Sequence, residues 1–256
     1  MSCLHRRAVL VALIMLPAMP RPAHATWSII VLDRKQRLIG VAGASCTSDV
    51  YGIMSLRPGL GVLIAQAIGY DPAIQRANKL IGDSVSSDSV IKAITPPTLD
   101  SASQYRQYAV ATFAGGLAQF TGDSTARYHG QRRAIDVLVQ GNSLADAAVL
   151  DRVMGAIQTA RAAHRPLQEI LMAGLAAGAA AGGDVRCGKQ RATSSFLVVA
   201  RPGERAFLPY LTLSVFGAER GTVNAVDVLA ARLGRWRASG GSRNRITQEG
   251  VQPPGR

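Results

Sequence analysis

Residues 26–32 read Thr-Trp-Ser-Ile-Ile-Val-Leu, a run of β-branched, aromatic and aliphatic side chains that predicts a β-strand. A polar turn at residues 33–37 follows it. Residues 38–44, Leu-Ile-Gly-Val-Ala-Gly-Ala, then predict a second strand whose glycines allow another backbone to approach closely. We expect this second strand to lie beside the first, so that the fold begins with a pair of neighbouring strands.

Residues 1–25 contain the three parts of a secretory signal peptide. Two arginines precede an apolar run at residues 8–16, and Ala-His-Ala at 23–25 forms a small-x-small cleavage site. The apolar run is followed by a proline and is too short to span a bilayer, which disfavours a retained anchor. We therefore expect cleavage after residue 25 and a periplasmic or secreted bacterial protein that begins at Thr26.

The composition limits the classes of partner. The chain has 256 residues and a formal net charge of +13, which falls to +10 when the three arginines of residues 1–25 are removed. The other arginines are scattered, with few aromatic residues among them, so we expect no nucleic-acid partner. Residues 26–237 are expected to form one domain without a transmembrane segment. Residues 238–256 predict a disordered basic tail that either contacts anionic envelope components or only adds solubilising charge.

The rest of the chain predicts groups of strands separated by groups of helices. Strands are expected at residues 59–67, 105–113, 117–121, 134–140, 193–200 and 206–215, and helices at 72–81, 88–94, 144–163, 166–181 and 223–237. Asp71 is expected to cap the first helix, with a proline after it. This order favours an α+β fold with two antiparallel sheets covered by helices, because alternating parallel units would place a helix after each strand.

Cleavage after residue 25 would leave a free α-amine on Thr26, the residue that also carries a hydroxyl. A hydroxyl of ordinary acidity is a weak nucleophile, and an α-amine with a pKa near 8 can accept its proton at neutral pH. Thr26 is therefore a candidate for both nucleophile and base. Chance is the alternative, because some residue must follow every cleavage site.

Five further residues are candidates for supporting roles, each with a structural alternative. Asp184 follows two glycines, where it would orient the amine or hydroxyl, or cap a turn. Gln140 and Asn142 would offer amide donors to a substrate carbonyl, or Asn142 would cap a helix. Ser45 and Cys46 end the second predicted strand, where they would line the same pocket or serve the fold alone.

Cysteines and histidines indicate no metal chemistry. Cys46 and Cys187 would remain after export, either as a disulfide or as two free thiols. His129 and His164 have no partner at metal-ligand spacing. The chain also lacks a phosphate-binding glycine loop, a nucleophile elbow and a dinucleotide fingerprint, so we expect no cofactor.

Six short motifs occur in order along the chain: TWSIIV at 26–31, GVAGASC at 40–46, GLGV at 59–62 with Gln66, FTG at 120–122, QGN at 140–142 with Leu144, and AGGDVR at 181–186. Together they resemble the bacterial domain-of-unknown-function family 1028, which is grouped with the N-terminal nucleophile hydrolases. The resemblance covers about residues 26–215. It implies a four-layer αββα sandwich of two antiparallel sheets covered by helices.

In that superfamily an N-terminal Thr, Ser or Cys attacks an amide carbonyl, its own amine transfers the proton, and water releases the acyl group. The resemblance places Thr26 in that role and implies a small amide or peptide-like substrate, with a homo-oligomer as one arrangement. We expect a catalytic set of Thr26, Asp184, Ser45 and Asn142, substrate contacts from Gln66, Gln140, Cys46 and Arg186, and oxyanion donors among the backbone amides of residues 59–61.

The alternative is a non-catalytic envelope-binding or assembly protein that keeps this fold. It is favoured by two departures from proteasome subunits, which have an acidic residue after the second strand and a lysine that tunes the nucleophile. The positions comparable to that acidic residue here are Ala44 and Ser45, and the lysine has no clear match.

Overall fold

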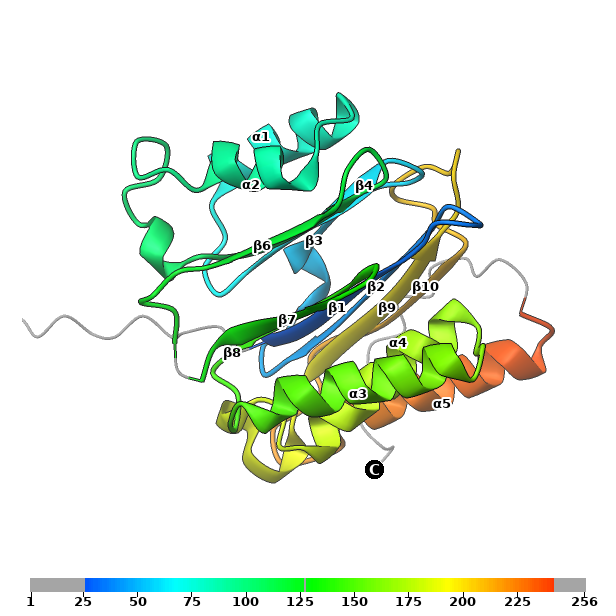
Figure 1. Cartoon of the computed structure of the whole chain (residues 1–256). Helices are drawn as coiled ribbons and strands as arrows, with labels where there is room; N and C mark the ends of the chain where they lie inside the picture. Colours follow the sequence, from blue (N-terminus) through cyan, green and yellow to red (C-terminus); the bar gives the residue numbers. More distant parts are fainter. Residues whose placement is uncertain (1–25, 127, 242–256) are drawn as a thin grey trace, which may run out of the picture.

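The computed structural model describes residues 26–126 and 128–241, and they form an α+β fold with two antiparallel sheets (Figure 1). The predicted signal peptide and most of the predicted basic tail lie outside the described residues. The larger sheet has six strands in the order β10 (Leu211–Val215), β9 (Ser194–Ala200), β2 (Leu38–Ser45), β1 (Thr26–Asp33), β8 (Val137–Asn142) and β7 (Gly130–Ala134). The smaller sheet has four, in the order β3 (Met54–Arg57), β4 (Gly61–Gln66), β5 (Gln107–Thr112) and β6 (Leu117–Thr121).

Helices cover the outer face of each sheet. Two of them, α1 (Asp71–Gly82) and α2 (Ser87–Ile94), contact the four-stranded sheet. The other three, α3 (Ala148–Ala162), α4 (Leu167–Ala180) and α5 (Ala225–Ala238), lie against the six-stranded sheet (Figure 1). No helix within residues 26–126 and 128–241 has the length and apolar character needed to cross a membrane.

Strand β1 shows how the sequence produces these layers. Side chains alternate along a strand. Trp27 and Ile29 therefore join the cluster under α3, α4 and α5, while Ile30 and Leu32 join the cluster between the two sheets. All four are buried, so the short run at the start of the fold contributes to two separate cores.

The glycines of α4 let this helix approach the sheet closely. A Cβ atom at Gly178 would lie 2.5 Å from Nε1 of Trp27, and one at Gly174 would lie 2.7 Å from Cδ1 of Ile29. Contacts this short do not occur between real side chains. The small residues of α4 are therefore required by its contact with β1.

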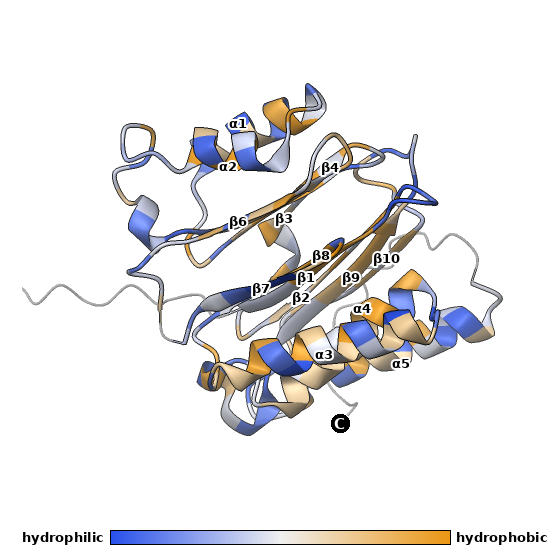
Figure 2. Cartoon of the chain, viewed as in Figure 1, coloured by the Kyte–Doolittle hydropathy of each residue, from blue (hydrophilic) through white to orange (hydrophobic). Residues whose placement is uncertain are grey.

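Two strands were not predicted from the sequence. The first, β3, has only four residues, and β7 reads Gly-Gln-Arg-Arg-Ala, which lacks the apolar alternation of a half-buried strand. This strand lies at the edge of the six-stranded sheet and is mostly hydrophilic (Figure 2). Charged side chains are common on edge strands, where they discourage pairing with another chain.

Several predicted boundaries and one predicted cap are wrong. The expected N-cap, Asp71, is the first residue of α1, and Tyr70 occupies the N-cap position without a side-chain hydrogen bond. The helix expected from residue 144 begins at Ala148, because Leu144 instead forms an isolated β-bridge with Asp184. The strand expected at 206–215 begins only at Leu211.

Candidate functional site

Thr26 is the first residue of β1, between β2 on one side and β8 on the other. Its register partners are Ser45 on β2 and Asn142 on β8. Side chains of directly opposed residues lie on the same face of a sheet. This face is the one that meets the four-stranded sheet, because Ser28 Oγ, two residues along, donates to Gln66 Oε1 on β4 at 2.6 Å. The three polar side chains therefore meet at one end of the space between the sheets.

The Thr26 hydroxyl bonds to the Ser45 hydroxyl, with 3.3 Å between the oxygens. Ser45 Oγ also lies 3.1 Å from Thr47 Oγ1 and 3.5 Å from Nη2 of Arg186. A serine hydroxyl has one proton to donate and two lone pairs. Because the Arg186 nitrogen can only donate, the Ser45 oxygen accepts from it. The Ser45 hydroxyl thus connects the hydroxyls of Thr26 and Thr47 to the guanidinium of Arg186.

Asp184 and Arg186 form an ion pair beside Ser45, whose Oγ Arg186 contacts. Asp184 is completely buried, and its Oδ2 accepts from Arg186 Nη2 at 2.7 Å and from the backbone N–H of Cys46 at 2.7 Å. Its Oδ1 accepts from the backbone N–H of Arg186 at 3.0 Å. The carboxylate thus caps the 3-10 helix Val185–Gln190 and also fixes Arg186 against Ser45. The turn-cap interpretation of Asp184 is confirmed, and within the described part of the chain Asp184 is connected to the Thr26 hydroxyl only indirectly, through Arg186 and Ser45.

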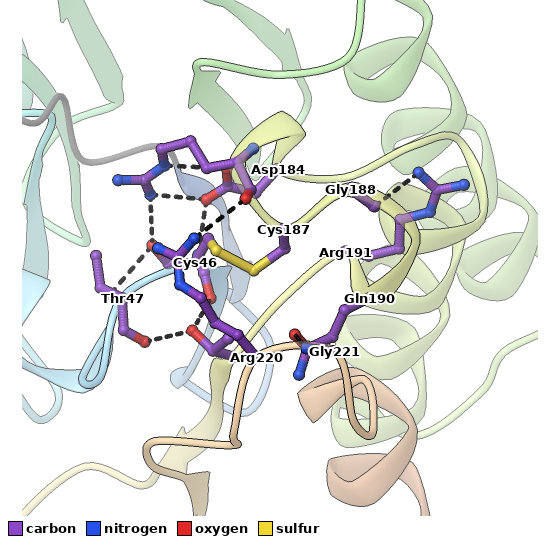
Figure 3. Close-up of a disulfide and its surroundings, with 12 residues drawn as sticks. Cys46, Thr47, Asp184, Cys187, Gly188, Gln190, Arg191, Arg220 and Gly221 are labelled. Atoms are coloured by element: carbon purple, nitrogen blue, oxygen red, sulfur yellow. Dashed lines mark hydrogen bonds and ion pairs between the residues drawn. A yellow bond between two sulfur atoms is a disulfide. The ribbon is translucent and has the colours of Figure 1, made fainter.

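A disulfide joins Cys46, directly after β2, to Cys187 in the same 3-10 helix (Figure 3). The S–S distance is 2.06 Å and the Cα atoms are 5.6 Å apart. Of the two states that the sequence left open, the structure has the disulfide. Cys46, expected to contact substrate, is buried and bonded to Cys187, so its sulfur holds the loop of Asp184 and Arg186 beside the end of β2.

Amide side chains from the four-stranded sheet complete the cluster. Gln66 Nε2 donates to the backbone carbonyl of Thr26 at 3.3 Å and to Gln107 Oε1 at 2.7 Å. Asn142 Nδ2 also donates to Gln107 Oε1, at 3.2 Å. Gln66, expected to bind substrate, is therefore engaged in holding Thr26. Asn142 lies inside β8 and does not cap α3, so that alternative is wrong.

Sequence reasoning missed Gln107, which links the two sheets. Its Nε2 donates to the carbonyl of Gly141 at 3.0 Å, while its Oε1 receives Gln66 and Asn142. The only available signal was a glutamine near the start of the strand predicted at residues 105–113. Gln140 faces the same space, and neither of its amide atoms has a hydrogen-bond partner within the described part of the chain.

Thr26 is 2% exposed in the uncut chain. A cavity of about 720 Å³ lies at the other end of β1 and is lined by Asp33 and Lys35. The glycines at 59 and 61 also lie at that other end, because the Gly59 carbonyl accepts from Arg37 in the β1–β2 turn at 2.7 Å. They do not supply oxyanion donors to Thr26, and that expectation is wrong.

Acidic, histidine and cysteine side chains do not gather anywhere in residues 26–126 and 128–241 in a group of three that would hold a metal ion. The polar cluster contains one ion pair, Asp184 with Arg186, and otherwise hydroxyl and amide groups. Such a set can orient a hydroxyl nucleophile and form hydrogen bonds with an amide.

The model of a family of unknown function, DUF1028, matches residues 26–223. The chain belongs to the DUF1028 family. Its structure is similar to the crystal structure of the DUF1028 protein SPO2555 from Silicibacter pomeroyi, with a TM-score of 0.69 and 22% identity over 87% of this chain and 99% of that one. At this identity the likeness shows the fold alone. No curated protein matches the chain at a significant level. In this DUF1028 protein, the family match begins at Thr26.

Proposed function

We propose that this protein is an exported amide hydrolase of the N-terminal nucleophile type, with Thr26 as the nucleophile. The observation that carries the proposal is the chain of contacts from the Thr26 hydroxyl through Ser45 to Arg186 and Asp184 at the start of β1. The family match that begins at Thr26 supports it. The arrangement of the helices also supports the four-layer αββα sandwich of that superfamily. The two stacked sheets are covered by α1 and α2 on one side and by α3, α4 and α5 on the other.

Export is part of the proposed mechanism. Cleavage of the bond before Thr26 converts a non-basic peptide nitrogen into an amine that can accept a proton near neutral pH. Before cleavage the threonine hydroxyl has no such base beside it, and the residue is nearly inaccessible in the uncut chain. The enzyme is thus inactive until the signal peptide has been removed.

In the proposed reaction, Thr26 Oγ1 attacks the carbonyl carbon of a small amide or peptide-like substrate while its proton passes to the α-amine. The carbonyl π-bond opens to give a tetrahedral oxyanion. The C–N bond then breaks, and the leaving amine takes the proton. Water cleaves the resulting ester through the same amine, which restores the threonine. Ser45 and the Asp184–Arg186 pair act as positioning residues. They hold the Thr26 hydroxyl in place and take no part in making or breaking bonds.

A non-catalytic envelope-binding or assembly protein is the second candidate. It is favoured by the burial of Thr26 and by the many hydrogen bonds that engage Gln66 and Gln107 within the fold. In this alternative the polar cluster stabilises the contact between the two sheets and performs no chemistry.

The first experiment determines the N-terminus by intact mass and N-terminal sequencing of the exported protein. We expect Thr26 as the first residue. A mature chain that retains residue 25, or begins after Thr26, would remove the proposed nucleophile.

The second experiment treats the exported protein with a β-lactone, an electrophile that acylates activated hydroxyls, and locates the adduct by mass spectrometry. We expect a single ester on Thr26 that is absent from Thr26→Ala and reduced, but present, in Thr26→Ser, which keeps a hydroxyl beside the amine. Thr95→Ala is the matched control, because Thr95 is the C-cap of α2, which packs on β5 and β6, and its hydroxyl donates to the carbonyl of Ile91. Equal labelling of Thr26→Ala and Thr95→Ala would favour the binding protein.

A further inference from the structure

The cavity of about 720 Å³ is a cleft that the proposed hydrolase reaction does not use. It is bounded by the β1–β2 turn, the turn between β7 and β8, the α3–α4 turn and the first turn of α4. Thr26 and the cleft lie at opposite ends of β1, seven residues apart, which corresponds to about 23 Å at 3.3 Å per residue. A volume of this order is typical of sites for small ligands.

Positive charge predominates in the lining of this cleft. Five of the lining side chains are arginine or lysine and two are aspartate, namely Arg34, Lys35, Arg161, Arg165 and Arg201 against Asp33 and Asp136. These residues come from four separate parts of the sequence. The fold therefore brings together positive charges that no single sequence cluster contains.

Two of the five cations are paired with carboxylates. Arg34 Nε lies 2.6 Å from Asp136 Oδ1, and Arg165 Nη2 lies 2.7 Å from Glu169 Oε2. The remaining acid of the lining, Asp33, accepts the backbone N–H of Gln36 through its Oδ1. The excess of positive charge is therefore not removed by these pairs.

The other three cations, Lys35, Arg161 and Arg201, form no ion pair with any residue in the described part of the chain. Arg161 Nη1 donates to the carbonyl of Ile135 at 2.6 Å, and the Arg201 guanidinium lies 3.5 Å from the centroid of the Tyr210 ring. Both contacts hold a guanidinium in place without an ion pair to it. An arginine oriented in this way loses little further entropy when it binds an oxyanion. The nearby Glu204 carboxylate accepts the backbone N–H groups of Arg201 and Tyr210, at 2.9 and 2.8 Å.

Helix α4 adds backbone donors to the same cleft. Pro166, its N-cap, makes no side-chain hydrogen bond, and Pro166, Leu167 and Gln168 all line the cleft. The first N–H groups of a helix have no acceptor within the helix, and this end carries the positive pole of the helix dipole. Glu169 in the same turn is engaged by Arg165 and, at 3.1 Å, by Arg237.

We propose that this cleft binds a small soluble ligand with at least two phosphoryl groups. Guanidinium groups match the geometry of phosphate oxygens with two parallel hydrogen bonds, and three cations that form no ion pair within the described residues suit a ligand with more than one negative charge. The site is separate from Thr26 and does not depend on the hydrolase proposal.

The test titrates inorganic pyrophosphate into the purified full chain at low salt and measures heat. We expect saturable binding that weakens as salt is added. Arg161→Gln/Arg201→Gln should weaken binding about tenfold for each guanidinium removed. The matched control, Arg76→Gln/Arg152→Gln, removes the same charge from exposed residues of α1 and α3 outside the cleft and should bind within about twofold of the parent.

Two results would overturn the proposal: no saturable binding of pyrophosphate to the parent, or an equal loss in the cleft variant and the control, which would indicate general attraction to a basic surface. Thermal melts of both variants establish that each is folded. A second arm uses vesicles that contain anionic phospholipid. If the vesicles bind and pyrophosphate neither binds nor displaces them, the ligand is a membrane surface and the assignment of a small soluble ligand is wrong.

Discussion

Removal of the Cys46–Cys187 disulfide should destabilise the protein strongly, because this bond closes a very long loop. The two cysteines are separated by 141 residues in the sequence. For a loop of this length, the chain-entropy relation gives about 5 kcal/mol at 25 °C, and removal of native disulfides typically costs about 2 to 5 kcal/mol. We therefore expect Cys46→Ala/Cys187→Ala to lower the free energy of unfolding by about 2 to 5 kcal/mol.

Urea unfolding followed by tryptophan fluorescence measures this change. The chain has two tryptophans, Trp27 and Trp236, which are 0% and 8% exposed, so both report loss of the core around α4 and α5. Measurements with and without reductant distinguish the contribution of the cross-link to stability from that of the packing of the two side chains. It should bring the parent close to the double variant and leave the variant unchanged.

A loss of less than about 1 kcal/mol in the double variant would refute this reasoning. It would mean that the contacts of Asp184 with Cys46 and Arg186 already hold the loop as firmly as the covalent bond. A parent that does not respond to reductant, while the double variant is strongly destabilised, would instead assign the effect to packing.

Two substitutions and one control test the packing of helices on the six-stranded sheet and the burial of a tyrosine in the four-stranded sheet. Gly178→Ala should lower the free energy of unfolding by about 1 to 3 kcal/mol, because the new methyl group meets Trp27. The control Gly155→Ala places a methyl group in open space and should be neutral or stabilising by up to about 1 kcal/mol. Thermal melts compare the two variants, and equal effects would contradict the close contact of α4 with β1. Tyr108 has a buried hydroxyl with no hydrogen-bond partner in the described part of the chain, and burial raises the pKa of Tyr108 to about 12. Tyr108→Phe should thus be neutral or slightly stabilising at pH 7. The parent should lose about 2 kcal/mol relative to this variant as the pH rises from 10 to 12, because the unfolded chain ionises first. Parallel urea curves at pH 7, 10 and 12 would show no such divergence if the hydroxyl were exposed.

The order of strands and helices could be predicted from the sequence because it depends on local periodicity and turn residues. The apolar run at residues 26–32 is a strand in any context that buries both of its faces. Pro72 and the Gly-rich turns mark where elements begin and end, because their backbone preferences are local. The edge strand β7 was not predicted, because its sequence lacks this local periodicity. Its polar residues form a strand only because β8 offers a partner along the whole of its length.

The features of the candidate site also divide into those that the sequence predicts and those that depend on the tertiary structure. The sequence by itself determined the hydroxyl at the start of β1, the hydroxyl at the end of β2, and the aspartate after two glycines, because each marks the end of a local element. Only the tertiary structure decided that Gln107 reaches across from the other sheet, that Cys46 pairs with Cys187, and that Gly59 lies far from Thr26. These relations depend on strand register and on the stacking of two sheets, which contacts between residues distant in the sequence establish and local periodicity does not encode.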